Sequence, residues 1–167
     1  MKSRPSFTLI ELLLYISLTA IITFSVSSFL VVTIDARVKN QTVAEVEQQG
    51  QTAMVMMTQA IRNAQGINSP ALGEVTNTLS LDVIEVSKDP TTFTLAAGQL
   101  WVQEGVAPAV ALTNTRIRVM DMSFIDLSRS SQSRSVRINL VLNYFNTSGR
   151  NIHTYTKVFQ AAANPRP

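Results

Sequence analysis

The chain of 167 residues contains no cysteine and a single histidine, His153. The lack of cysteine excludes a disulfide scaffold, thiolate zinc sites, iron–sulfur clusters and cysteine nucleophiles. One histidine leaves no pair for a histidine-rich metal site. The six glycines are never closer than seven residues apart, so the sequence has no glycine-rich loop for a nucleotide phosphate. We therefore expect no cofactor, no metal ion and no enzymatic activity.

Charged residues are scarce as well, and they are unevenly distributed. They make up 15% of the chain, where about a quarter is usual. Residues 7–115 carry four cations and nine anions, whereas residues 116–167 carry eight cations and two anions. A basic C-terminal third could meet nucleic acid, an anionic membrane or an acidic partner. A solvated surface is the commoner explanation of such charge.

The longest uncharged segment is residues 12–34, which form an apolar run of 23 residues near the N-terminus. As a helix this run would be about 35 Å long, enough to cross a hydrocarbon core of about 30 Å. It contains several hydroxyl residues, which an apolar helix tolerates by bonding them to carbonyl groups one turn back. An ordinary secretory signal has a shorter apolar stretch, and a carboxylate, Glu11, stands at the head of this one.

The residues that head the run form a motif. A short basic leader with Lys2 and Arg4 precedes Phe7-Thr-Leu-Ile-Glu11. This pattern resembles the processing signal of type IV prepilins and type II secretion pseudopilins. In that family a basic leader and a glycine precede Phe-Thr-Leu-Ile-Glu and a long apolar helix. Phe7 matches the first mature residue, whereas the small residue Ser6 stands where the family has glycine.

The resemblance implies a processing and assembly pathway. A prepilin peptidase would cut between Ser6 and Phe7, the new amine of Phe7 would be methylated, and Glu11 would be needed for assembly. The expected partners are other pilins or pseudopilins, the peptidase and the inner-membrane assembly platform. The chain would cross the bacterial inner membrane once, with its N-terminus in the cytoplasm and its C-terminal domain outside, before it enters a pilus or pseudopilus.

The rest of the chain predicts an α+β fold. Apolar residues at helical spacing continue to residue 64, with Gly50 as a candidate bend and Gly66 as a candidate C-cap. From residue 76 onward the apolar residues alternate with polar ones, as in antiparallel strands joined by short turns. The expected division is a leader (1–6), a transmembrane or filament-core helix half (7–34), an amphipathic helix half (35–66), an antiparallel β domain (67–160) and a loose tail (161–167).

This layout resembles the pilin fold, with a long N-terminal helix packed on an antiparallel sheet. The strand order resembles that of J-type minor pseudopilins and related minor pilins. The segments that carry this likeness are Gly98-Gln-Leu-Trp101, Leu112-Thr-Asn114 and Ser135-Val-Arg-Ile-Asn-Leu140.

Three functions compete at this point. The first is a structural, minor filament subunit of a pilus or secretion pseudopilus. The second is a DNA-binding pilin-like protein of a competence system, in which Arg129, Arg134 and Arg137 would contact phosphates. The serine-rich segment between these arginines lacks the aromatics of a base-stacking platform. The third, a membrane-anchored enzyme, is disfavoured because nucleophile, metal and cofactor signatures are missing.

Overall fold

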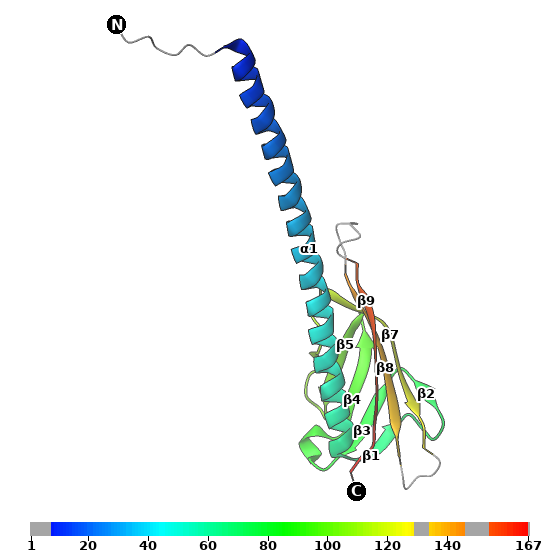
Figure 1. The fold of residues 1–167 in the computed structure, drawn as a ribbon. Coiled ribbons are helices and arrows are strands. Elements are labelled where there is room, and N and C mark those ends of the chain that lie inside the picture. The colour runs from blue at the N-terminus through cyan, green and yellow to red at the C-terminus, as the bar shows by residue number, and fades with distance from the viewer. Residues whose placement is uncertain (1–7, 129–133, 146–153, 167) are drawn as a thin grey trace. The chain divides into compact units, whose positions relative to one another are not determined.

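The computed structural model describes residues 8–128, 134–145 and 154–166. The chain divides into two compact units, residues 1–40 and residues 41–167. One α-helix, α1 (Leu9–Asn63), begins in the first unit and ends in the second, and the strands follow it in the chain (Figure 1). The fold is therefore α+β, as the sequence predicts, with a long N-terminal helix followed by antiparallel sheets.

The first unit consists of the N-terminal part of α1. The helix begins after Thr8, whose side-chain hydroxyl accepts a hydrogen bond of 3.3 Å from the backbone N–H of Glu11. The carbonyl of Thr8 accepts a second bond of 3.2 Å from the N–H of Leu12. Threonine is a favoured N-cap residue because its side chain satisfies an N–H that has no partner inside the helix. None of the side chains of residues 8–41 is buried.

In the second unit the remainder of α1 presents one buried stripe. Its members recur three or four residues apart, which is the spacing of one face of a helix. They are Thr42, Val46, Gly50, Ala53, Met54, Met57 and Ile61. The amphipathic half of the helix expected from the sequence is thus confirmed, and its first buried residue, Thr42, is the second residue of the second unit.

The strands form two antiparallel sheets. Sheet A has the order β1-β3-β4-β5-β6 and sheet B the order β2-β7-β8-β9. The strands of sheet A are β1 (Ala64–Ser69), β3 (Leu79–Val83), β4 (Thr91–Ala96), β5 (Gln99–Glu104) and β6 (Val110–Ala111). Those of sheet B are β2 (Val75–Thr76), β7 (Ile117–Asp126), β8 (Val136–Tyr144) and β9 (Thr156–Ala163). A 3₁₀ turn, η1 (Val86–Lys88), lies between β3 and β4.

The core collects side chains from α1 and from both sheets. On β8 the residues Val136, Ile138, Leu140 and Leu142 are fully buried and alternate with more exposed ones. Leu79 and Leu81 of β3, Phe93 of β4 and Leu100 of β5 come from sheet A, and Met57 and Ile61 come from α1. The apolar face of the helix is therefore the cover that a sheet with one apolar face needs.

The two glycines expected to shape the helix have other roles. Gly66 lies in β1 opposite Asp82 rather than at a helix C-cap, because α1 already ends at Asn63. Gly50 lies in an uninterrupted stretch of α1, where a Cβ atom would overlap the ring of Phe159 on β9. The absence of a side chain at Gly50 allows sheet B to approach the helix closely. Helix propensity alone does not predict this role of the glycine.

The end of the chain also differs from the expectation. Strand β9 extends to Ala163, which is buried, so residues 161–163 belong to sheet B rather than to a loose tail. Beyond the strand, the backbone N–H of Arg166 donates a 3.2 Å hydrogen bond to the carbonyl of Arg62 near the end of α1. The described part of the C-terminal segment is therefore attached to the helix.

Candidate functional site

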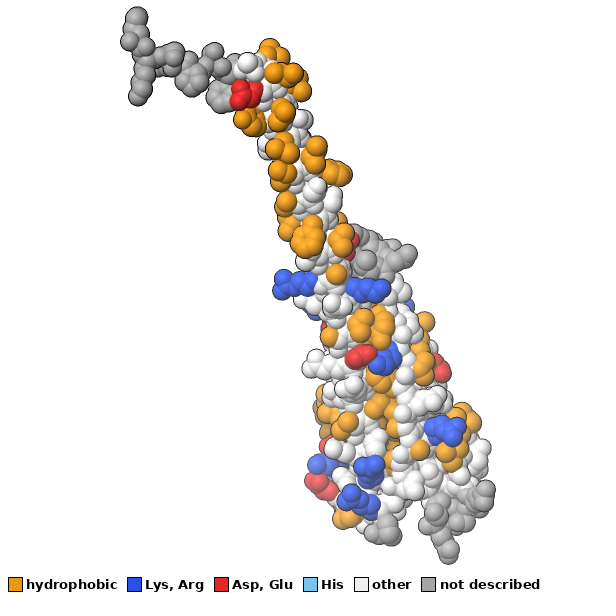
Figure 2. Space-filling view, viewed as in Figure 1, with side chains coloured by type: hydrophobic (Ala, Val, Ile, Leu, Met, Phe, Trp, Pro, Cys, Tyr) orange, Lys and Arg blue, Asp and Glu red, His pale blue; other side chains and the backbone are white. Residues whose placement is uncertain are grey.

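The first candidate site is the exposed apolar segment of α1. Figure 2 shows hydrophobic side chains gathered along this part of the helix. α1 is long and apolar enough to cross a membrane, judged by length and composition. Four of its serine and threonine hydroxyls donate to backbone carbonyls one turn back, as expected. These bonds are Ser17 to Leu14 (2.9 Å), Thr19 to Tyr15 (2.7 Å), Ser25 to Ile21 (2.9 Å) and Thr33 to Phe29 (2.8 Å).

Glu11 lies in the first turn of this helix. Its side chain is less exposed than those of its neighbours, and its Oε1 accepts a hydrogen bond of 3.4 Å from the phenolic hydroxyl of Tyr15. A carboxylate in a first turn also interacts favourably with the helix dipole. Sequence reasoning missed both Thr8 and Tyr15. The signals were present, because Thr8 and Glu11 have the spacing of a capping box and Tyr15 follows Glu11 by one turn.

The expected cleavage site, Ser6 and Phe7, lies outside the described residues. The structure places the beginning of α1 at Leu9, two residues after the expected scissile bond. Cleavage and methylation at this position therefore stay predictions.

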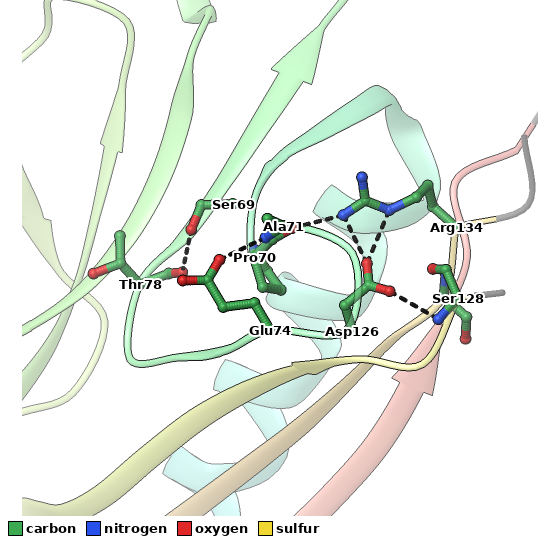
Figure 3. A network of polar contacts seen from close by, with 9 residues as sticks. Ser69, Pro70, Ala71, Glu74, Thr78, Asp126, Ser128 and Arg134 are labelled. Atoms are coloured by element: carbon green, nitrogen blue, oxygen red, sulfur yellow. Dashed lines mark hydrogen bonds and ion pairs between the residues drawn. The ribbon is translucent and has the colours of Figure 1, made fainter. Parts of the chain in front are cut away.

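The second candidate site, the arginine group, is arranged differently from the expectation. Arg134 Nε donates to Asp126 Oδ2 at 2.8 Å, and Arg134 Nη2 lies 2.6 Å from the same oxygen (Figure 3). The same Nη2 also donates to the carbonyl of Pro70 at 2.6 Å. The Asp126 side chain is completely buried, and that of Arg134 is 17% exposed. Arg134 is therefore a structural residue that joins the β1–β2 connection to sheet B.

The ionisation of Asp126 follows from these contacts. Burial by itself would raise the pKa of this carboxyl, but hydrogen bonds from Ser128 and the guanidinium of Arg134 outweigh it and lower the pKa. The backbone N–H of Ser128 donates to Asp126 Oδ1 at 2.8 Å. Asp126 is thus a buried anion at neutral pH, held by a cation and by backbone groups.

Of the other two arginines, the structure describes only Arg137. Arg137 is exposed on β8, where it pairs with Ile125 of β7 and Ala162 of β9. Arg129 lies outside the described residues. In the part of the chain that the structure describes, no group of three or more His, Asp or Glu residues could hold a metal ion.

Two glutamates tie α1 to the β domain from its polar side. Glu45 Oε1 accepts a 2.7 Å hydrogen bond from the amide of Asn114, in the segment between β6 and β7. Glu47 Oε1 accepts a 2.5 Å bond from Nζ of Lys157 on β9. The Lys157 ammonium lowers the pKa of Glu47, and Glu47 in turn raises the pKa of Lys157. The helix is therefore attached to sheet B by ionic as well as apolar contacts.

No protein-family model matches this chain, and comparisons with curated proteins and with solved structures give no match either. The class that the fold and the helix define is an α+β chain with an N-terminal apolar helix that could anchor it in a membrane.

Proposed function

We propose that this chain is a structural pilin-like subunit, a minor component at the initiating end or tip of a type IV pilus or type II secretion pseudopilus. The observation that carries the proposal is the change of environment along α1. Large apolar side chains are exposed from Leu9 to Ile34, whereas a buried stripe begins at Thr42. One helix thus serves as an anchor in its first part and as a packing element in its second.

The exposed part of α1 needs an apolar environment. Leu9, Ile10, Phe24 and Phe29 are each at least 70% exposed in the isolated chain. A soluble monomer rarely exposes so much contiguous apolar surface. A bilayer can cover it before assembly, and the same helices of neighbouring subunits can cover it afterwards. The bonds from four of its hydroxyls to carbonyl groups of the same helix suit both environments.

The proposal includes the processing that the N-terminal motif implies. The chain inserts in the inner membrane with its N-terminus in the cytoplasm and its β domain outside. Prepilin peptidase removes residues 1–6, Phe7 is methylated, and the inner-membrane assembly platform brings the subunit to other pilins or pseudopilins. Glu11 then takes part in assembly.

Mass spectrometry of the full chain, extracted from membranes of cells with an active prepilin peptidase, tests this proposal. The expected N-terminus is a methylated Phe7, and a peptidase-deficient strain supplies the unprocessed control. Sheared filament fractions from the same cells should contain the processed form. An intact Met1 in the presence of the active peptidase would contradict the proposal.

A DNA-binding pilin-like protein of a competence system is the second candidate. The exposed position of Arg137 supports it, whereas the engagement of Arg134 with Asp126 and Pro70 leaves that side chain little freedom to bind phosphate. Affinity for DNA that falls steeply with salt and drops in Arg137→Ala would favour this candidate.

A further inference from the structure

We propose that Tyr15 is the partner of Glu11 while the subunit is in the membrane, so that its hydroxyl holds and orients the carboxylate until assembly. The hydroxyl of Tyr15 donates to Glu11 Oε1 across one helical turn, at 3.4 Å. Tyr15 is therefore a positioning residue. This inference rests on the proposed function, since it assigns a partner to the residue expected to act in assembly.

The need for a partner comes from the cost of a lone charge in an apolar environment. Glu11 heads the uncharged run, and charged side chains inside membrane helices are rare and are usually paired. Its backbone N–H is already bonded to Thr8, which leaves the carboxylate oxygens to be satisfied by other groups. The Tyr15 hydroxyl is a donor that the structure places within reach of one of these oxygens.

The hydroxyl of Tyr15 also needs a hydrogen-bond partner in an apolar environment. A phenol in an apolar setting usually finds a hydrogen-bond partner for its hydroxyl. The shorter hydroxyls of Ser17, Thr19 and Ser25 donate to backbone carbonyls of α1, so they satisfy themselves on the helix. Tyr15 is too long for that bond, and its hydroxyl reaches a side chain instead. Glu11 and Tyr15 thus satisfy each other at a spacing of four residues.

The contact also has a consequence for orientation. Because Tyr15 lies one turn further along the helix, the bond draws the Glu11 carboxylate toward the same face of α1. A carboxylate held on one face meets a cationic group of a neighbouring subunit only when that subunit has the matching register. The bond is weak enough to be exchanged, since the partner is a neutral hydroxyl that a cation can replace.

A double-mutant cycle on the full chain tests this inference without any filament. The chain has no cysteine, so a single Val106→Cys in a fully exposed turn reports translocation of the β domain. Inverted inner-membrane vesicles protect this thiol from an impermeant maleimide when the chain has inserted. The ratio of protected to labelled chain is measured for Tyr15→Phe in the Glu11 background and in the Glu11→Val background.

We expect Tyr15→Phe to lower this ratio about three- to tenfold when Glu11 is present, as for a hydrogen bond within a membrane. In the Glu11→Val background the same change should leave the ratio equal or slightly higher, since phenylalanine is the more apolar residue. Thr19→Val is the matched control, because its hydroxyl bonds a backbone carbonyl, and its effect should be the same in both backgrounds.

An equal loss in both backgrounds, or no loss when Glu11 is present, would overturn the role of Tyr15. Either result would leave the proposed function standing, because insertion does not require assembly. Conversely, a chain that shows the coupling but never enters filaments would refute the proposed function and retain the Glu11–Tyr15 contact.

Discussion

The two parts of α1 belong to one continuous helix, but their apolar side chains are in different environments. Along residues 9–40 no side chain is buried, and four hydroxyl side chains bond to carbonyl groups of the helix itself. Along residues 41–63 one stripe is buried, and glutamates on the polar side bond to the β domain. The apolar side chains of the first part therefore need a membrane or other subunits to cover them, whereas those of the second part are covered by the β domain of the same chain. Changes in the two parts should have separable effects.

The largest effect on solubility and cooperative unfolding is expected from truncating the chain at different points along α1. A chain that starts at Gln41 retains every buried residue of α1, so it should be soluble, rich in strand and cooperative in thermal unfolding. A chain that starts at Ala64 loses the cover of both sheets and should aggregate, because the core would be open to water. Circular dichroism and light scattering compare the two. Equal solubility and equally cooperative melting would show that the helix is dispensable for the sheets.

Glu11→Val should abolish entry into filaments and leave the β domain intact. The residue lies in the first unit, far along the chain from the buried stripe that begins at Thr42. Quantitative blotting of sheared filaments against the membrane pool measures incorporation, and thermal melting of the chain measures the domain. Ile10→Val, a change of similar size next to it, is the control and should be incorporated normally. Normal incorporation of Glu11→Val would exclude the assembly role.

Arg134→Met should lower the unfolding free energy by about 3 kcal/mol, since it leaves the buried Asp126 carboxylate without its cation. Folding lowers the pKa of the Asp126 carboxyl. The ion pair therefore stabilises the fold fully at pH values above the pKa of an aspartate in an unfolded chain, about 3.9. This stabilisation is lost as the pH falls through the lower pKa that Asp126 has in the folded chain. The difference between wild type and variant should therefore be full near pH 7 and shrink below about pH 4. Urea unfolding across this range measures it.

Arg137→Met is the control for the arginine change, because Arg137 is exposed on β8, three residues after Arg134. It should shift the unfolding free energy by no more than about 0.5 kcal/mol, as for other surface substitutions. If Arg134→Met were equally mild, or if its effect did not depend on pH, the buried ion pair would not be what stabilises this end of the domain.

Gly50→Ala should destabilise the β domain by about 1–3 kcal/mol, because the added Cβ overlaps the ring of Phe159. Helix propensity alone predicts the opposite sign, a gain of about 1 kcal/mol. Denaturant unfolding decides the sign. In a Phe159→Ala background the ring is gone, and Gly50→Ala should become neutral or stabilising. Destabilisation of equal size in both backgrounds would show that close approach of the sheet is not the reason for the glycine.

The smallest effect is expected from Glu47→Gln, which removes the charge that pairs with the partly exposed Lys157. Exposed ion pairs contribute little, so the melting temperature should fall slightly and the loss should vanish in high salt. Differential scanning calorimetry at two salt concentrations measures it. Since folding lowers the pKa of Glu47, the contribution is present at neutral pH and is lost as the pH falls through the folded pKa. A loss that persists in high salt would indicate a packing role.

Much of the fold follows from periodicity in the sequence. The helical spacing from Val46 to Ile61 predicts the buried stripe, and the alternation from Val136 to Leu142 predicts the inward face of β8. The short turns expected between antiparallel strands include the one between β4 and β5, where Ala97 and Gly98 have φ values of 52° and 74°. Positive φ at both positions is typical of the two-residue turns that join antiparallel strands.

Features that depend on contacts between distant residues could not be predicted. Nothing near Gly50 in the sequence indicates Phe159, and nothing near Pro70 indicates Arg134. The division of the strands between two sheets is equally non-local, because alternation defines a strand but not its neighbour. The arginine group therefore resembled an open phosphate site in the sequence, although Arg134 forms an ion pair with the buried Asp126. Within α1 the Glu11–Tyr15 contact is local, and its spacing could have indicated it.

The junction between helix and strand limits how the length of this chain can change. Strand β1 begins at Ala64, directly after α1 ends at Asn63, so no linker residue separates them. One residue inserted in the last turn of the helix would rotate the following segment by about 100°. One inserted in the strand would exchange its inward and outward faces. Insertions and deletions at this junction should therefore be strongly disruptive, and variation in length among descendants of this chain should fall elsewhere.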